Sequence, residues 1–209
     1  MAHPAEDAGP AGNSRLTSAT GMLLLLMLAV EGVTVLRVRQ LITLHVYLGL
    51  LLLGPVLLKT ASTTYRFARY YTGSAPYVRK GPPHPVLRVL GPLVIITSLT
   101  LLGSGVALIA TAPGSDGLLL TTHKVSFFLW FAVMAVHVIG HLREAATDSL
   151  DELRSGPAGG ARGRNLRILL IAVALAAGVA TATSLMPTAT PWTSRSDTHQ
   201  GAGHHAAGG

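Results

Sequence analysis

The chain has 209 residues, of which 49% are hydrophobic and only 12% are charged, and it contains no cysteine. Soluble domains carry about 25% charged residues, so this composition indicates a membrane protein, and the lack of cysteine excludes disulfides, thiolate metal sites and covalent C-x-x-C-H haem attachment. The formal net charge of +7 does not indicate nucleic-acid binding, because the basic residues cluster between apolar segments.

Residues 1–15 are rich in Ala, Gly and Pro and lack the basic start of a cleaved signal peptide, so we expect a disordered N-terminus followed by a retained helix. Residues 16–186 contain five apolar stretches of about 20 residues, the length that crosses the roughly 30 Å hydrocarbon layer. These stretches are residues 16–36, 41–60, 89–111, 118–141 and 166–186. Residues 187–209 have too little apolar surface to fold alone, and we expect a disordered tail. The sequence therefore predicts an all-α integral membrane bundle of five transmembrane helices.

Basic residues in the loops predict the orientation of this bundle. Two connections are rich in arginine or lysine, and the loop "APGSDG" between the third and fourth stretches has none. The basic residues concerned are Arg66, Arg69, Arg79 and Lys80 in one connection, and Arg143, Arg154, Arg162 and Arg164 in the other. The positive-inside rule then predicts a plasma-membrane protein with a cytoplasmic N-terminus and an external C-terminus. Arg37 and Arg39, in the tight connection "RVRQ", lie on the outer side and are exceptions.

Histidines occur at matched depths in two of the predicted helices. His45 lies four residues after Leu41 and His123 lies five after Leu118, and both helices enter from the outer face. Two side chains at the same depth on neighbouring helices can bind one ligand together. Fourteen residues later the second helix has Lys59 and the fourth has His137, and fourteen residues is about 40° short of four turns, so each pair shares a helix face.

Ionisable groups in an apolar helix are costly in lipid and normally face a protein interior, where bundles build cofactor sites. Neutral imidazole is a suitable axial ligand for the iron of a non-covalent haem, and small residues let a macrocycle approach the helix backbone. Cations near the outer surface would receive the haem propionates, which would explain the two exceptional arginines. The further candidate site residues are Gly49, Gly103 and Gly105 for close approach, and Arg37, Arg39 and Lys124 for the propionates.

The two parallel histidine-bearing helices resemble the four-helix core of respiratory cytochrome b and the membrane cytochrome b subunits of hydrogenases and formate dehydrogenases. The resemblance covers about residues 20–142 and rests on the His-x13-His pattern. It implies that the first four helices form a haem-binding bundle with two haems stacked across the membrane. His45 and His123 match one ligand pair completely, whereas the other pair matches only at His137, because Lys59 stands at its partner position. The departure favours one haem b, or a polar inner site formed by Lys59 and His137.

Several residues have simpler explanations. We expect His141 to be interfacial and Lys59 to extend to the cytoplasmic surface. For His137, ligation and local hydrogen bonding remain open alternatives. We expect Glu31 to pair with Arg37 or Arg39, and a role in proton relay or quinol binding is the alternative. His84 is expected to be a loop residue, and the tail histidines His199, His204 and His205 need no function.

The predicted function is electron transfer, in which haem b passes single electrons between a quinone pool and a partner redox protein. The chain would then be a subunit of an oxidoreductase rather than a stand-alone enzyme, with membrane lipid, a redox subunit and quinone as partners and no nucleic acid. One alternative is a proton-coupled transporter that uses Glu31, His45, His123 and His137 as a relay. Another is a haem-free scaffold subunit in which the histidines only join helices.

Overall fold

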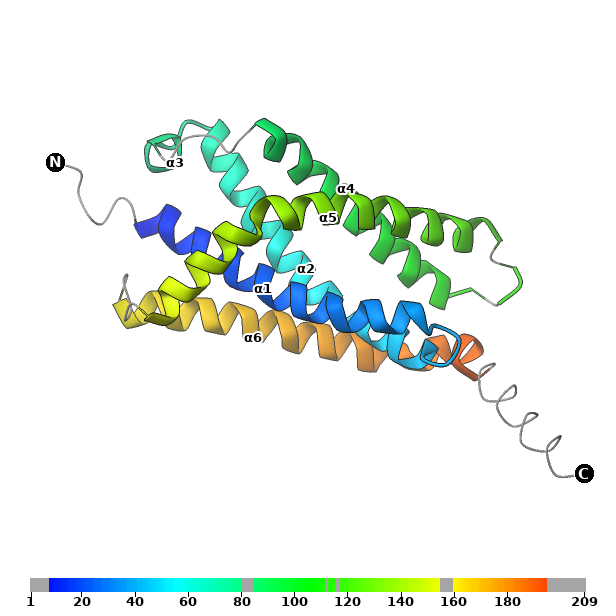
Figure 1. Cartoon of the computed structure of the whole chain (residues 1–209). Coiled ribbons are helices and arrows are strands. Elements are labelled where there is room, and N and C mark those ends of the chain that lie inside the picture. The colour runs from blue at the N-terminus through cyan, green and yellow to red at the C-terminus, as the bar shows by residue number, and fades with distance from the viewer. Residues whose placement is uncertain (1–7, 80–84, 112, 116, 155–159, 195–209) are drawn as a thin grey trace, which may run out of the picture.

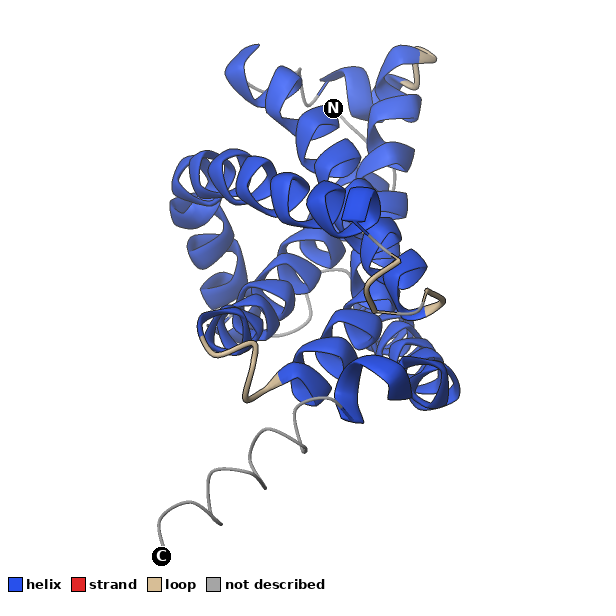
Figure 2. Cartoon of the chain, turned by 90° about the vertical axis from the view of Figure 1, so that its right-hand side faces the viewer, coloured by secondary structure: helices blue, strands red, loops and turns tan. Residues whose placement is uncertain are grey.

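The computed structural model describes residues 8–79, 85–111, 113–115, 117–154 and 160–194, and Figure 1 shows their arrangement. These residues form helices and short turns, without a strand among them (Figure 2). The helices are α1 (Ala8–Leu36), α2 (Ile42–Tyr71), α3 (Ala75–Arg79), α4 (Pro85–Ile109), α5 (Gly117–Arg154) and α6 (Gly160–Leu185), and α6 continues into the 3-10 helix η1 (Met186–Ala189).

Five helices in the described part of the chain are long and apolar enough to cross a membrane. Their candidate spans are Gly12–Leu36, Ile42–Tyr71, Val89–Ile109, Gly117–Gly140 and Gly163–Ser194. Inside hydrocarbon each backbone N–H and C=O must be bonded within the protein, which a helix does with its own residues. The predicted fold class, an all-α multi-pass membrane protein, is confirmed.

The helices extend beyond the apolar stretches that revealed them. α1 begins at Ala8, α2 continues to Tyr71 and α5 continues to Arg154. Hydrophobicity marks only the part of a helix that lies in lipid, whereas the backbone hydrogen bonds continue into polar sequence. Residues 8–15 of the predicted disordered N-terminus are therefore helical.

The start of the predicted disordered tail is also ordered. Residues 187–194 continue from α6 through η1 into a last helical turn. The indole Nε1 of Trp192 donates a hydrogen bond of 2.9 Å to the backbone carbonyl of Thr111, just beyond α4. The expectation of disorder was wrong for this segment, because one tryptophan supplies both apolar surface and a polar anchor. His84, His199, His204 and His205 lie outside the described residues.

The first four candidate spans form a ring. Close backbone contacts run from α1 to α2, from α2 to α4, from α4 to α5 and from α5 back to α1 (Figures 1 and 2). α2 and α5 are consequently opposite members of this ring. A side chain that points inward from α2 thus faces one that points inward from α5.

The last helix, α6, packs on the outside of the ring against α2. Gly54 of α2 faces the backbone of Ala174, and Gly178 of α6 faces the backbone of Leu51. A Cβ atom at either glycine would overlap the opposing carbonyl oxygen. Paired small residues let two membrane helices approach at backbone distance, which maximises their van der Waals contact.

Candidate functional site: a histidine pair inside the ring

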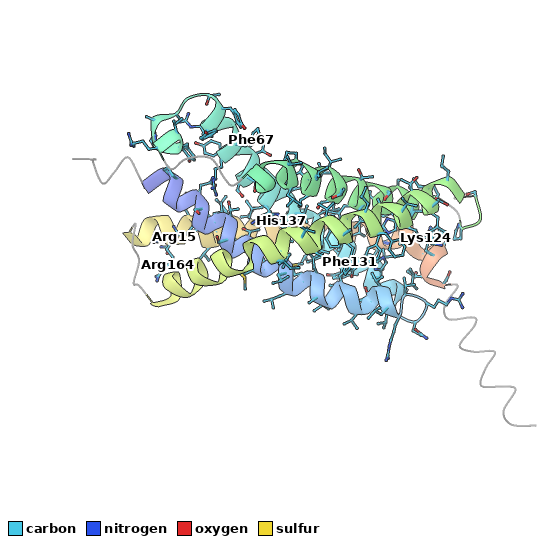
Figure 3. The ribbon with its side chains drawn as sticks, turned by 45° about the horizontal axis from the view of Figure 1, so that its top comes forward. Arg15, Phe67, Lys124, Phe131, His137 and Arg164 are labelled. Atoms are coloured by element: carbon cyan, nitrogen blue, oxygen red, sulfur yellow. The ribbon has the colours of Figure 1, made fainter. Side chains whose placement is uncertain are left out.

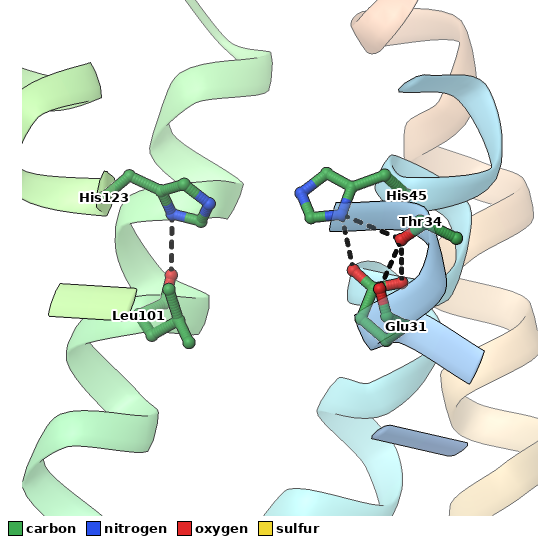
Figure 4. Close-up of polar contacts among 5 residues, drawn as sticks. All are labelled: Glu31, Thr34, His45, Leu101 and His123. Atoms are coloured by element: carbon green, nitrogen blue, oxygen red, sulfur yellow. Dashed lines mark hydrogen bonds and ion pairs between the residues drawn. The ribbon is translucent and has the colours of Figure 1, made fainter. Parts of the chain in front are cut away.

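His45 and His123 face each other inside the ring. His45 is the fourth residue of α2 and His123 is the seventh of α5, so both lie near the same end of the bundle. Their ring centroids are 6.4 Å apart and their ring planes are inclined at 74° (Figure 4). The structure thus brings together the two histidines that were predicted to pair because they lie at matched depths.

A carboxylate from α1 holds the His45 ring. Nδ1 of His45 lies 2.7 Å from Oε1 of Glu31 and 3.3 Å from Oγ1 of Thr34 (Figure 4). The Thr34 hydroxyl also lies 2.9 Å from Oε2 of Glu31, and Glu31 and Thr34 are only 9% and 1% exposed. Because Glu31 and Thr34 are three residues apart, they lie on one face of α1 and reach His45 together.

Neutral groups from α4 hold the His123 ring. Nδ1 of His123 lies 3.2 Å from the carbonyl oxygen of Leu101 and 3.1 Å from Oγ of Ser104. Gly105 lies against the same ring, where a Cβ atom would come within 3.2 Å of Cε1. The His123 ring is therefore fixed in direction by α4, through a hydrogen bond at Nδ1 and a close contact at Cε1.

These contacts determine which nitrogen of each ring is available. A carbonyl oxygen only accepts hydrogen bonds, so Nδ1 of His123 carries a proton, and Nδ1 of His45 donates in the same way to the Glu31 carboxylate. In a neutral ring the other nitrogen, Nε2, is then an acceptor. Figure 4 shows that both Nε2 atoms point into the space between the rings. Two acceptor nitrogens cannot form a hydrogen bond with each other, but together they can bind a cation.

The separation of the rings also fits a bridging metal. Imidazole nitrogens bind metal ions at about 2.0 Å, so two ligands on opposite sides of one ion have ring centroids about 6 Å apart. The observed separation is 6.4 Å. Ligating histidines usually donate their second N–H to a carboxylate or a carbonyl, and both kinds of partner are present here. The residues of the pair therefore fit axial ligation of a haem iron.

The other predicted site residues lie at different distances from the pair. A Cβ atom at Gly49 would be 3.9 Å from Oε1 of Glu31, so this glycine borders the site, as Gly105 does. Gly103 is exposed and has open space around its Cα. Arg37, Arg39 and Lys124 are exposed near the histidine end of the bundle, and Lys124 is labelled in Figure 3.

His137 and Lys59 lie further along the same two helices. Fourteen residues of helix separate each from the pair, which corresponds to about 21 Å at a rise of 1.5 Å per residue. His137 has a buried Nδ1 atom and lies part-way along α5 (Figure 3). His141 belongs to α5, but its side chain lies outside the described part of the structure.

Lys59 does not extend to the surface as we expected. Its Nζ donates a hydrogen bond of 2.5 Å to the Thr17 carbonyl of α1, and Gly21 of α1 leaves room for the ammonium group. Ser62 and Thr17 join their hydroxyls at 3.1 Å, and Asn13 donates to the Ser62 carbonyl at 3.2 Å. A polar cluster between α1 and α2 therefore captures the lysine, because a buried donor is stabilised by an acceptor within reach.

The partners of the two imidazoles were not predicted from the sequence. The expected pairing of Glu31 with Arg37 or Arg39 was wrong, since Glu31 pairs with His45. The i, i+3 spacing of Glu31 and Thr34 was the available signal, because it places two polar groups on one face of an apolar helix. Ser104 beside Gly105 gave a similar signal in α4. No family model, curated protein or solved structure matches this chain.

Proposed function

We propose that this chain is a membrane electron-transfer protein that binds one non-covalent haem b between His45 and His123. The observation that carries the proposal is the orientation of the two rings, each held at Nδ1 and each turning Nε2 toward the other. As a subunit of an oxidoreductase, it would pass single electrons between a quinone pool and a partner redox protein.

The number of ligands favours haem over a bare metal ion. Structural and catalytic metal ions in proteins take three or more side-chain ligands, whereas haem iron takes one or two axial ligands and receives the rest from its macrocycle. Among the described residues, no further His, Cys, Asp or Glu completes a group of three with the pair. Two opposed imidazoles are the set that haem iron uses.

The remaining residues of the site have supporting roles in this proposal. Bound haem supplies reversible one-electron oxidation and reduction at its iron. The chain positions both imidazoles inside a ring of four helices, and Gly49 and Gly105 border the site. Arg37, Arg39 and Lys124 lie near the histidine end and would neutralise propionates.

The loop charges favour an orientation in the plasma membrane. Arg15 and Arg164 lie at the opposite end of the bundle from Lys124 (Figure 3). With the arginine-rich end in the cytoplasm, the histidine pair lies in the outer half of the membrane. The N-terminus is then cytoplasmic and the C-terminus external, and a partner redox subunit would dock where electrons enter or leave.

The test is the visible absorption spectrum of the detergent-purified protein from haem-replete cells, oxidised and then reduced with dithionite. We expect a low-spin haem-b spectrum that His45→Ala and His123→Ala each abolish. The matched control is His137→Ala, which removes an imidazole from the same helix and should retain the spectrum. A colourless wild-type protein of native helical content would overturn the proposal.

A proton relay is the second candidate, and the contact of 2.7 Å between Glu31 and His45 favours it. A carboxylate and an imidazole at this distance exchange a proton readily, and such groups inside a membrane commonly mark proton pathways. This function predicts a colourless protein that acidifies or alkalinises the lumen of proteoliposomes, and that loses this activity in both Glu31→Gln and His45→Ala.

A further inference from the structure

We infer that Glu31 is a positioning residue of the proposed haem centre: it aims His45 and lowers the reduction potential of the iron. This inference rests on the proposed function, and it assigns α1 a role in a site whose two ligands come from α2 and α5.

The two imidazoles have chemically different partners. Nδ1 of His45 lies 2.7 Å from a carboxylate oxygen, whereas Nδ1 of His123 is bonded to a carbonyl oxygen at 3.2 Å, with the Ser104 hydroxyl at 3.1 Å. Hydrogen bonds to a charged acceptor are roughly twice as strong as those between neutral groups. The His45 ring is therefore held more firmly and receives more electron density than the His123 ring.

Glu31 is itself held in place. The Thr34 hydroxyl lies 2.9 Å from its second oxygen, Oε2, and Nδ1 of His45 lies 2.7 Å from its first oxygen, Oε1. The residue is 9% exposed. A side chain fixed at both oxygens presents one orientation to the imidazole, so it directs the Nε2 atom of His45 toward His123.

The charge of Glu31 has a consequence for the iron. A carboxylate in an apolar bundle is costly unless a positive charge compensates it. Ferric haem carries one more positive charge than ferrous haem, so a nearby carboxylate stabilises the oxidised state more than the reduced state. A hydrogen bond that makes the ligand more basic acts in the same direction. Both effects lower the reduction potential.

The experiment compares the wild type with Glu31→Gln and Ser104→Ala. Gln keeps the size of Glu and one acceptor oxygen for Nδ1 of His45, but it has no charge and carries an NH2 donor in place of the second oxygen. Ser104→Ala is the matched control, because it removes a neutral partner from the other imidazole and leaves the Leu101 carbonyl in place. Haem content, the reduced spectrum and the midpoint potential are measured for each at one pH.

We expect Glu31→Gln to retain haem. Its preference for ferric over ferrous iron should fall tenfold or more, which corresponds to a rise in the midpoint potential of at least about 59 mV for a one-electron couple. Ser104→Ala should shift the potential by much less. Equal potentials in the wild type and Glu31→Gln would overturn the inference while leaving the haem assignment intact. A wild-type protein without haem would instead overturn the proposed function, and this inference with it.

A third variant covers the case in which Glu31→Gln loses haem. Glu31→Asp keeps the charge and shortens the side chain by one methylene. A haem-bearing Glu31→Asp protein with a potential near that of the wild type would support the role of the charge. Loss of haem from both Glu31 variants would assign Glu31 to assembly of the site and overturn its role in setting the potential.

Discussion

Gly105 of α4 lies directly against the His123 ring, so that a Cβ atom on residue 105 would be 3.2 Å from Cε1 of the imidazole. Gly103, two residues earlier on the same helix, faces open space. The two glycines thus form a matched pair for testing how closely the ring position is defined.

Substituting Leu for Gly105 should displace His123, because overpacking a closed contact costs about 1–3 kcal/mol. We expect haem to bind roughly tenfold more weakly, the effect of about 1.4 kcal/mol. Gly103→Leu introduces the same side chain on the same helix and should bind haem like the wild type. Titration of the apoprotein with haem, followed by absorbance, measures both. Equal affinities for the two variants would contradict the close contact at residue 105.

The contact between α2 and α6 should be sensitive to a single methyl group. Gly54→Ala places a Cβ against the Ala174 carbonyl, where the two backbones leave no room. The free energy of unfolding should fall by about 1–3 kcal/mol. The control is Gly32→Ala, since a Cβ there meets nothing within 4 Å. Unfolding of both in mixed micelles with increasing SDS measures the difference, and equal stabilities would show that α6 packs further from α2.

The hydroxyls of Thr17 and Ser62, 3.1 Å apart, should be coupled energetically. Hydrogen bonds between membrane helices contribute on average about 0.6 kcal/mol in double-mutant cycles. We expect a coupling energy of about this size from the cycle of Thr17→Val and Ser62→Ala. Thr97 bonds to the backbone of its own helix, α4, so Thr17→Val and Thr97→Val should be additive. Additive effects of Thr17→Val and Ser62→Ala would show that this hydrogen bond does not stabilise the α1–α2 interface.

Tyr77 of α3 should ionise only at unusually high pH. Burial and the neighbouring Tyr65, whose ring centroid is 6.2 Å away, raise the pKa of Tyr77 above 10.0, although Arg69 opposes the shift. The folded protein therefore favours the neutral phenol. This contribution to stability is complete below pH 10.0 and is lost as the pH rises through the folded pKa.

Spectrophotometric titration of tyrosinate tests this pKa. Tyr65→Phe should lower the pKa of Tyr77, because it removes a neighbouring phenol and its hydrogen bond. Tyr71→Phe is the control, since the Tyr71 ring packs on Phe67 and Tyr70. A late-titrating tyrosine that persists unchanged in Tyr65→Phe would show that burial alone sets the shift.

Helix number and the placement of the histidine pair could be predicted because both depend on position along a helix. A stretch of about 20 apolar residues has few folded states in lipid other than a spanning helix. The depth of a residue in the membrane then follows from the number of residues that separate it from the start of the helix. His45 and His123 were predicted to pair on this basis.

The partners of Glu31 and Lys59 could not be predicted in this way. A charged side chain reaches several neighbours, and the rotation of α1 about its own axis decides which of them it meets. Three-dimensional packing sets that rotation, for which α1 gives little indication because it is apolar around most of its surface. The polar residues Thr17, Thr20, Glu31 and Thr34 mark its inward face only once their partners are known.

The histidine pair lies in the first two turns of α2 and α5, and this position limits how far across the membrane a single haem could carry an electron. The level where a second centre would lie is about 21 Å further along the helices, and there the Lys59 amino group is bonded to α1. In the proposed function, an electron that enters and leaves through this pair stays on one side of the roughly 30 Å hydrocarbon layer. The transfer would not be electrogenic, and it would neither use nor store the roughly 2.3 kcal/mol that one charge gains per 100 mV. Electron donor and acceptor would meet the protein at the same face of the membrane.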